Sequence, residues 1–454
     1  MAQHQRSITD FLTPSRNRAS VGTAALLRLP HHTKSLWNFA YARLFAISIG
    51  QLRSWEDVFE ILCDLAVESR QVERRSDLYL ESLRDLSLRE DSEKYLQICL
   101  KTAQWAIEAP RLFPESFVFP IFKQRETSNL TLSREQIRCL LALMLWCVFP
   151  RQEREHNLPR DYTFYKVLGP AKGKRDQQIA KLMCLFAYFE SVEQLNPLEC
   201  VSFSRSYMTD RVVWPECTER LSTLFIDESK DLVETKDRMI KVDFANSYFG
   251  GGVLGFGTVQ EECMLLAYVE PIVGVLFIEQ LGDKDAVHIQ GARVVNRYSG
   301  YQSEFRWEAT VDPPIVLDSQ GRNDDTIAVI DAINFDGREL EQYYGHWIER
   351  ELNKALQGFK AQDVEGKRPV ATGNWGCGAF RGDPQLKFLI QWIAASVCGR
   401  PMYYITWEIP ELQRLSEVHG RLSNRNTGEV VRVLLQYRSH RDKSLFEFVL
   451  GRLC

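Results

Sequence analysis

The stretch Lys241–Glu270 has the sequence KVDFANSYFGGGVLGFGTVQEECMLLAYVE, and the interpretation of the whole chain starts from it. A short apolar run, Ile240–Phe244, carries one acid, Asp243. Three consecutive glycines follow, and an apolar run of helical length begins at the sequence QEE. A strand, a glycine-rich loop and a helix start in this order direct backbone N–H groups at a phosphate or diphosphate.

The glycines and the two glutamates have separate predicted roles. A residue without Cβ takes positive φ and lets the backbone approach a ligand closely, which is the role predicted for Gly250–Gly252. Thr258 is expected to cap the helix, with Glu261 completing a capping box. Adjacent glutamates point about 100° apart on a helix, so both cannot act as caps. Another task is therefore expected for one of the pair Glu261-Glu262.

Together these residues resemble the signature of the poly(ADP-ribose) glycohydrolases. In that signature GGG and QEE are separated by six to eight residues and follow VDFAN, and here seven residues separate them after Val242–Asn246. The run Leu130–Arg151 also resembles the helical region that precedes the catalytic domain of the family. The resemblance covers most of the chain and implies a macrodomain, the ADP-ribose-binding fold.

Length and composition limit the class of protein. A chain of 454 residues suggests two domains or one large elaborated domain, and 45% apolar with 26% charged residues is typical of a soluble globular protein. The net charge of −4 provides no overall basic field, so positive potential for a polyanionic substrate must be local. The longest apolar run, Cys139–Phe149, is too short to span a bilayer.

The cysteines and histidines indicate the compartment and argue against a metal. Eleven cysteines without a CxxC pair or a preceding signal peptide indicate free thiols in a reducing compartment, the nucleus or the cytoplasm. The one histidine cluster, His31-His32, has no Cys or carboxylate at ligand spacing, so we predict no metal and no cofactor.

Residues 1–24 are polar and are predicted to be a disordered tail. Within it Gln5, Ile8, Phe11 and Leu12 resemble the motif that docks peptides on the sliding clamp, proliferating cell nuclear antigen. Leu12 stands where a second aromatic residue is usual. Ile8, Phe11 and Leu12 would form a one-turn apolar plug, although short motifs also recur by chance in polar tails.

Residues 25–200 are predicted to form an all-helical accessory domain. Trp55–Ser69 has apolar residues at helical spacing, and Ala180–Val192 is predicted as a further helix. Ser133 begins a capping box with Gln136, and we expect Pro150 to end the helix that follows.

Residues 201–454 alternate between strands and helices, which predicts an α/β fold: a macrodomain-like mixed sheet flanked by helices. The predicted strands are Ile240–Phe244, Val287–Ile289, Ile327–Ile330, Val370–Thr372 and Met402–Thr406. The predicted helices are Val259–Val269, Leu340–Leu356 and Gln385–Val397.

A second glycine-rich loop, Ala371–Phe380, has the sequence ATGNWGCGAF and lies between a predicted strand and a predicted helix. Two such loops facing one crevice would grip a diphosphate from both sides. The loop resembles GNWGCGAFGGD of the same family, with Arg381 in place of a glycine. Cys377 is rejected as a nucleophile because no general base lies nearby in sequence and the family uses no thiol.

The resemblance also implies the substrate contacts. Val233 and Glu234 lie where the family recognises adenine, Tyr301 matches a substrate-contacting tyrosine, and Trp407 stands where relatives often have Phe. The predicted substrate-binding residues are Val233, Glu234, Asn246, Gly250, Gly251, Gly252, Gln260, Tyr301, Asn374, Gly376, Cys377, Gly378, Phe380 and Trp407.

The implied reaction is hydrolysis of the ribose–ribose O-glycosidic bonds of poly(ADP-ribose), which requires an acid at the leaving oxygen and stabilisation of an oxocarbenium-like centre. Glu262 is predicted to be this acid and later the base that activates water. Glu261 would hold ribose hydroxyls and position Glu262. Asp243 and Asn246 would fix the distal ribose and the loop.

Two other functions fit parts of the sequence. A macrodomain that binds ADP-ribose without cleaving it would also need the glycine loops, but it has no use for the acid pair Glu261-Glu262 beside a polyanion. A nucleotide hydrolase would need a metal cluster or a P-loop ending in Lys-Ser/Thr, and the sequence has neither. We expect a monomer without a membrane segment.

Overall fold

The computed structural model describes residues 27–453 except 28, 76–79, 118, 152–156, 160, 170–172, 231–233, 235, 237 and 362–366. The predicted clamp-docking residues Gln5, Ile8, Phe11 and Leu12 lie outside the described residues, as does Val233.

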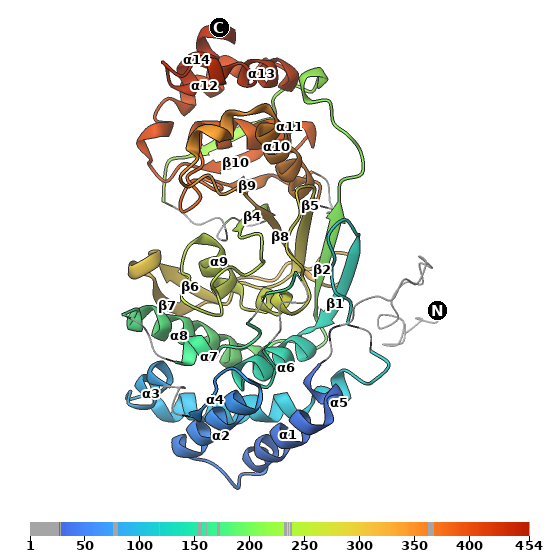
Figure 1. Cartoon of the computed structure of the whole chain (residues 1–454), viewed down its shortest axis with the longest axis vertical. Helices are drawn as coiled ribbons and strands as arrows, with labels where there is room; N and C mark the ends of the chain where they lie inside the picture. The colour runs from blue at the N-terminus through green and yellow to red at the C-terminus, as the bar shows by residue number, and fades with distance from the viewer. Residues whose placement is uncertain are drawn as a thin grey trace.

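An eight-stranded mixed sheet forms the centre of the molecule, in the order β1-β2-β5-β8-β4-β9-β10-β3 (Figure 1). Its strands are β1 (Ser128–Ser133), β2 (Cys200–Tyr207), β3 (Leu224–Asp227), β4 (Ile240–Ala245), β5 (Asp285–Gly291), β8 (Asn323–Asp331), β9 (Val370–Thr372) and β10 (Met402–Ile405). The five strands from β8 to β3 run parallel to one another, whereas β5, β2 and β1 pair antiparallel. The carboxyl ends of β8, β4, β9 and β10 therefore meet at one edge, where ligands bind in open α/β sheets.

The predicted strands and the α/β class are confirmed. Strand β8 shows why a continuous apolar run predicted a strand here. Ile327 and Val329 lie in one apolar core, and Ala328 and Ile330 lie in the other. Because alternate side chains of a strand point to opposite faces, both faces of this strand are covered, as a continuous apolar run predicts.

Helices cover both faces of the sheet. One face packs against α10 (Gly345–Phe359), α11 (Pro384–Val397) and the C-terminal helices α12 (Leu415–Leu422), α13 (Thr427–Leu434) and α14 (Leu445–Leu453). The other face packs against α9 (Gln260–Tyr268) and the helical part of the chain. The helix predicted at Leu340–Leu356 begins later, at Gly345, because Glu339–Tyr343 forms a 3-10 helix.

The helical part lies below the sheet in Figure 1. Its helices are α1 (Lys34–Ser48), α2 (Trp55–Glu68), α3 (Glu81–Ser87), α4 (Ser92–Ile107), α5 (Ala109–Leu112), α6 (Arg134–Leu145), α7 (Tyr165–Leu168) and α8 (Arg175–Ser191). The capping box of Ser133 with Gln136 is confirmed. Pro150 does not end that helix: it stops at Leu145, and Cys147 takes a left-handed φ of 55° before the proline is reached.

The helical part also contributes a strand that the sequence analysis did not predict. Strand β1 alternates exposed residues with buried Leu130 and Leu132, and it pairs antiparallel with β2 at the edge of the sheet. The buried Arg134 follows directly and pairs with Glu270 at 2.7 Å. Arg134 also donates to the carbonyl of Gly291 at 3.0 Å, so the helical part and the sheet are joined by buried polar contacts.

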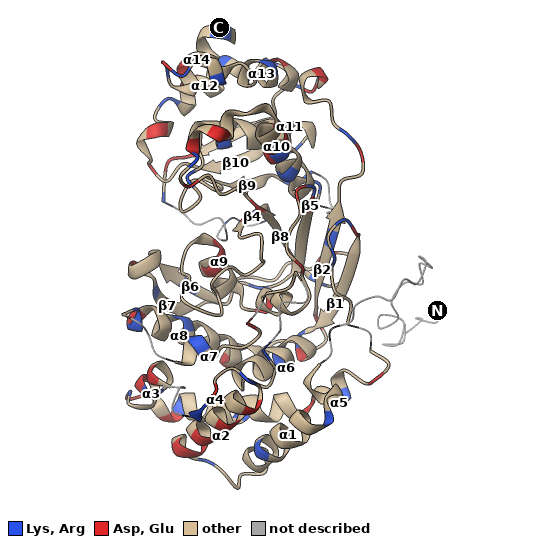
Figure 2. Cartoon of the chain, in the orientation of Figure 1, with Lys and Arg blue, Asp and Glu red and all other residues tan. Residues whose placement is uncertain are grey.

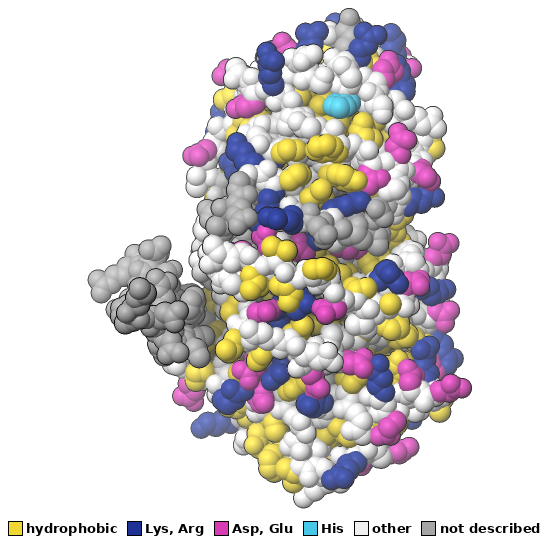
Figure 3. Space-filling view, turned by 180° about the vertical axis from the view of Figure 1, so that it is seen from behind, with side chains coloured by type: hydrophobic (Ala, Val, Ile, Leu, Met, Phe, Trp, Pro, Cys, Tyr) yellow, Lys and Arg dark blue, Asp and Glu magenta, His cyan; other side chains and the backbone are white. Residues whose placement is uncertain are grey.

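Acidic and basic side chains are interspersed along the ribbon (Figure 2), and the face seen in Figure 3 carries both signs together with small hydrophobic patches. In the described part of the chain, none of the helices combines the length and the apolar character that crossing a membrane requires.

Candidate active site

Asp243 lies on β4 near the carboxyl end of the strand and is completely buried. Among the described residues, neither oxygen of its carboxyl group has a hydrogen-bond partner. Burial raises the pKa of Asp243 well above its usual range, and the charges of Glu262 and Glu234 raise it further. The carboxyl therefore keeps its proton to higher pH than an exposed aspartate and is free to bind a ligand.

Glu261 lies in the first turn of α9 and binds the glycine-rich loop. Its Oε2 accepts the N–H of Asn246 at 2.8 Å, and its Oε1 accepts the N–H of Gly250 at 2.7 Å. Burial raises the pKa of Glu261 well above its usual range, as do the charges of Asp243 and Glu262, and these effects outweigh the two N–H donors.

Glu262 binds the same loop at two other positions. Its Oε1 accepts the N–H of Gly252 and its Oε2 accepts the N–H of Val259, at 2.7 and 2.8 Å. The predicted cap at Thr258 is therefore wrong: α9 begins at Gln260, and the Thr258 hydroxyl donates to the carbonyl of Gln302 at 3.2 Å. The Glu262 carboxylate accepts the N–H of the N-cap residue Val259, which is the bond from N3 back to the cap in a capping box, one residue later than predicted.

Gly251, with φ of 48°, is a glycine of the loop that lies close to both acids. A Cβ at this position would lie 2.5 Å from Oε1 of Glu262 and 2.6 Å from Oε2 of Glu261. A Cβ at Gly257 would also lie 2.5 Å from Oε1 of Glu262. The sequence analysis assigned the glycines to approach a diphosphate, and the structure gives them a second reason, the approach of the two carboxylates.

Gln260 connects α9 to the free end of β4. Its Oε1 accepts the N–H of Phe244 at 2.8 Å, and its Nε2 donates to the carbonyl of Val242 at 3.1 Å. Strand β4 pairs with β9 only through Ile240 and Lys241, so Gln260 continues that hydrogen bonding where the partner strand is absent. This contact places both glutamates beside Asp243.

The second glycine-rich loop is fixed to the end of β10. The Asn374 amide donates to the carbonyl of Thr406 and accepts from the Tyr404 hydroxyl, each at 3.0 Å. Gly376 has φ of 74°, and a Cβ there would lie 2.5 Å from the Cβ of Ala332. Gly378 is exposed and faces open space, so its backbone is accessible to a ligand.

Three further residues of this loop were named in the sequence analysis. Burial raises the pKa of the Cys377 thiol well above its usual range, so it stays protonated, in agreement with its rejection as a nucleophile. Phe380 is half-buried, and its carbonyl accepts the N–H of Phe335 at 2.9 Å. Arg381, which replaces a glycine, has φ of 55°, the left-handed backbone that glycine adopts more readily.

Aromatic rings line the other end of the site. The rings of Tyr301 and Trp407 lie 5.2 Å apart between centroids, and Tyr298 lies 6.2 Å from Tyr301. The Tyr298 hydroxyl donates to one oxygen of the buried Glu234, whose other oxygen has no hydrogen-bond partner among the described residues. Burial raises the pKa of Glu234. Trp407 has φ of 58°, a strained backbone of the kind found at ligand sites.

Two residues of this region were not predicted. Tyr298 lies in the same segment as Tyr301 and could have been found as its neighbour. Lys181 of α8 is buried and donates to carbonyls of the first glycine-rich loop. In the sequence, Lys181 could have been noticed because it is a lone lysine within the apolar run that predicted the helix at Ala180–Val192.

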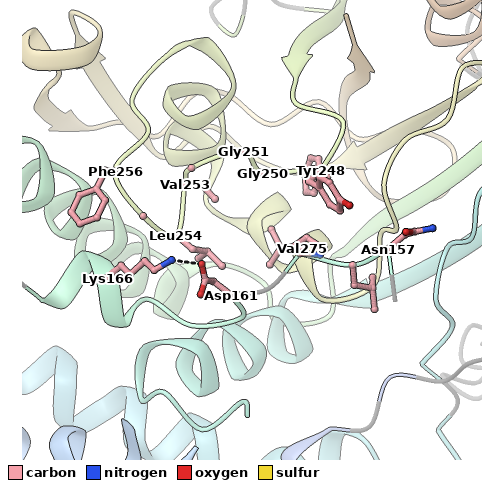
Figure 4. Close-up of a pocket in the computed structure, with 15 residues that line it drawn as sticks. Asn157, Asp161, Lys166, Tyr248, Gly250, Gly251, Val253, Leu254, Phe256 and Val275 are labelled. Atoms are coloured by element: carbon pink, nitrogen blue, oxygen red, sulfur yellow. Dashed lines mark hydrogen bonds and ion pairs between the residues drawn. The ribbon is translucent and has the colours of Figure 1, made fainter. Parts of the chain in front are cut away.

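A cavity of about 530 Å³ adjoins the first glycine-rich loop (Figure 4). The loop residues from Tyr248 to Phe256 form one wall, and Asn157 and the Lys166–Asp161 ion pair of 2.5 Å belong to the opposite side. Within the described ranges, no three His, Cys, Asp or Glu side chains are arranged to hold a metal ion.

Two family models match the chain. Residues 212–414 match the macrodomain-fold model of poly(ADP-ribose) glycohydrolase, and residues 87–205 match the helical-domain model of the same family. The chain is 29% identical over 370 residues to the probable poly(ADP-ribose) glycohydrolase 2 of Arabidopsis thaliana, covering 70% of each chain. It is 34% identical over 356 residues to poly(ADP-ribose) glycohydrolase 1 of Caenorhabditis elegans, covering 74% of this chain and 42% of that relative.

Solved structures of the same name are more distant. The poly(ADP-ribose) glycohydrolase of Thermomonospora curvata is 11% identical, with a TM-score of 0.31, and the match covers 69% of this chain and 93% of that one. The enzyme of Deinococcus radiodurans in complex with ADP-ribose is 14% identical, with a TM-score of 0.30, and the match covers 45% of this chain and 85% of that one.

Proposed function

The chain belongs to the poly(ADP-ribose) glycohydrolase family, and we propose that it hydrolyses the ribose–ribose O-glycosidic bonds of poly(ADP-ribose) with Glu262 as general acid and base. The observation that carries this assignment is the buried group of acids at the end of β4. Glu261 and Glu262 bind one glycine-rich loop with all four carboxylate oxygens, beside the unpaired Asp243. A protein that only binds ADP-ribose has no use for such a group of acids.

The reaction needs a proton at the leaving oxygen and a water at the carbon that loses it. Each oxygen of Glu262 accepts one N–H and keeps a second lone pair that can carry a proton. In the proposed sequence Glu262 gives this proton to the leaving ribose oxygen as the glycosidic C–O bond breaks. It then takes a proton from water as the new C–O bond forms, which releases ADP-ribose and restores the acid.

Asp243 and Glu261 act on the sugar in this proposal. Because burial raises the pKa of both carboxyl groups, they remain protonated to higher pH than exposed acids. In the protonated form they can donate hydrogen bonds to ribose hydroxyls. Protonation also limits the repulsion between the acids and the substrate's diphosphate. Asn246 is held by Glu261 through its backbone N–H, and its Oδ1 accepts the N–H of Tyr248 at 3.0 Å, so its Nδ2 would be the group that donates to the distal ribose.

The aromatic end of the site is assigned to adenine. The unpaired oxygen of Glu234 can accept a hydrogen bond from an exocyclic amine, together with Val233. Tyr301 and Trp407 contact each other directly, so a base would stack on the free side of one ring or separate the two. Gly378 and the neighbouring backbone of the second loop would face the diphosphate.

The tail, the location and the oligomeric state belong to the same proposal. Gln5, Ile8, Phe11 and Leu12 would dock on the sliding clamp, which would bring a chain with a net charge of −4 to polymer made on chromatin. We propose a monomer that acts in the nucleus, the cytoplasm or both.

The proposed activity is tested by incubating the purified protein with poly(ADP-ribose) in the presence of EDTA. We expect free ADP-ribose to accumulate and the chains to shorten. Polymer that is bound but left at full length would indicate a protein that only binds ADP-ribose. Release that occurs without the chelator and stops with it would contradict a metal-independent mechanism.

A further inference from the structure

Lys181 belongs to α8 of the helical part, but its side chain ends in the glycine-rich loop of the macrodomain. Its Nζ donates to the carbonyls of Gly252, Val253 and Gly255 at 3.1, 3.2 and 2.9 Å. An ammonium group has three hydrogen-bond donors, so all of them can be used on this one loop. The residue is only 1% exposed to solvent.

The loop transmits this contact to Glu262. Gly252 accepts from Lys181 with its carbonyl and donates its N–H to Oε1 of Glu262 at 2.7 Å. The same carbonyl accepts the N–H of Gly257 at 3.0 Å, and a Cβ at Gly257 would lie 2.5 Å from Glu262. The ammonium group, the loop and the carboxylate are thus joined by direct contacts, and a displaced loop would displace Glu262.

A lysine at this position is costly for folding. Taking an ammonium group out of water costs free energy unless hydrogen bonds replace the lost hydration, and an apolar side chain would avoid this cost. Its direct partners here are the three loop carbonyls, which replace water around the ammonium group. The hydrogen bonds to the loop are therefore the feature that the lysine provides.

We propose that Lys181 is a positioning residue for hydrolysis, through which the helical part fixes the loop that orients Glu262. This inference rests on the proposed function. It gives the helical part a role in positioning, because a side chain of α8 adds three hydrogen bonds to the loop that the macrodomain's own Glu261 and Glu262 also bind.

The charge of Lys181 also responds to pH. Burial lowers the pKa of Lys181 to about 8, while the charge of Glu262 opposes this shift. Cys263 of α9 and Cys184 of α8 raise the pKa of Lys181 as Glu262 does, and Lys174, which directly precedes α8, lowers it as burial does. Below this pH the ammonium group can donate to all three carbonyls. As the pH rises through about 8 it becomes an amine with two donors, so the loop should loosen and the rate should fall.

The first test compares Lys181→Met with Lys94→Met. Met is an unbranched side chain of similar volume, one atom shorter than Lys, and it has no hydrogen-bond donor. Lys94 of α4 forms an exposed ion pair of 2.7 Å with Glu190 at the other end of α8, so its replacement removes a lysine contact to the same helix as Lys181 but away from the loop. We expect Lys181→Met to lower kcat for polymer by roughly 10- to 100-fold with KM within about threefold, because small misplacements at a reacting centre have this effect. Lys94→Met should match the wild-type enzyme.

The second test measures hydrogen exchange of peptides that cover Gly250–Gly257, without substrate. We expect faster exchange in Lys181→Met than in wild type. In the wild-type protein, we expect protection of these amides, corrected for the intrinsic rate, to fall between about pH 7 and 9. If the variant does not fold, this wild-type measurement decides: protection that stays constant over the range would overturn the proposal.

The proposal would also be overturned if Lys181→Met had the same kcat and the same hydrogen exchange as the wild-type protein. Should the wild-type protein release no ADP-ribose from polymer, the proposed function fails instead. The exchange measurement would then still determine whether Lys181 holds the loop.

Discussion

Oε1 of Glu262 accepts the N–H of Gly252 at 2.7 Å, so the proposed catalytic acid and the glycine-rich loop hold each other in position. Glu261 binds Gly250 in the same way at 2.7 Å. The loop and the acid pair therefore form one unit, which explains why GGG and QEE occur close together in the sequence. A change in either part should affect both.

The loop glycine Gly251, which lies close to both acids, should not tolerate a methyl group. In Gly251→Ala the new Cβ would lie within 2.6 Å of both glutamates, at a φ that favours glycine. We expect polymer hydrolysis to fall by about 10²-fold or more. Gly255→Ala is the matched control, because its Cβ would meet only Lys166 and the Gly252 carbonyl at 3.7 Å or beyond. Equal activity of the two variants would show that Gly251 is only part of a turn.

The buried Asp243 should make the protein less stable as the pH rises. Its pKa is raised in the folded state, so folding favours the protonated form, and this stability is lost as the pH rises through the folded pKa. In Asp243→Asn no charge can form at this position. We expect its melting temperature to exceed that of wild type by about 2 °C or more at pH 8, and the difference to shrink towards pH 5.

The same variant should lose activity while it gains stability. A difference in melting temperature that is constant from pH 5 to pH 8 would show that Asp243 does not titrate differently in the folded protein. Glu261 and Glu234 remain in the variant, so its stability should still decline with pH, but less steeply than that of wild type.

Removal of the Tyr301 ring should weaken substrate positioning. We expect Tyr301→Ala to lower kcat/KM by a factor corresponding to about 1–3 kcal/mol, since the ring contacts Trp407 and the predicted base. Tyr301→Phe keeps the ring and should retain most of the activity. If Tyr301→Ala hydrolyses polymer as wild type does, the ring only packs against Trp407.

The clamp-docking proposal can be tested apart from the enzyme. A synthetic peptide covering residues 1–20 should bind purified sliding clamp in a titration, and the same peptide with Ile8→Ala and Phe11→Ala should not. The full-length double variant should hydrolyse polymer at the wild-type rate. Equal behaviour of the two peptides, whether both bind or neither does, would remove the assignment.

The sequence predicted the fold well where the apolar pattern is continuous. Runs such as Ile327–Ile330 are buried on both faces of the sheet, and their length and flanking residues distinguish them from helices. Strand β1 was not predicted because it lies between helices, and only Leu130 and Leu132 mark its buried face. Pairing with β2, which is distant in sequence, is what makes this segment a strand.

Local patterns were less reliable for the contacts within the site. The capping box at Thr258 fits the sequence, but the loop places the N–H of Val259 at the carboxylate of Glu262 instead. The position of Lys181 depends on how α8 packs on the loop. The spacing of residues within α8 or within the loop does not indicate this packing. Motifs therefore identified the acids, and tertiary packing determined what orients them.

The most direct test of the account compares the rate of ADP-ribose release from polymer by Glu262→Gln and by Glu261→Gln. Each glutamate accepts two backbone N–H groups, and each Gln variant must lose one of them, because an amide nitrogen cannot accept. The structural damage is therefore matched, and only Glu262 is assigned the proton transfer. ADP-ribose binding, measured by calorimetry, should survive in both variants.

We predict that Glu262→Gln lowers the rate by about 10²–10⁴ or more, and that Glu261→Gln lowers it distinctly less. Equal losses in the two variants would assign the effect to distortion of the loop. Turnover by Glu262→Gln at the wild-type rate would contradict the central claim that this residue is the acid.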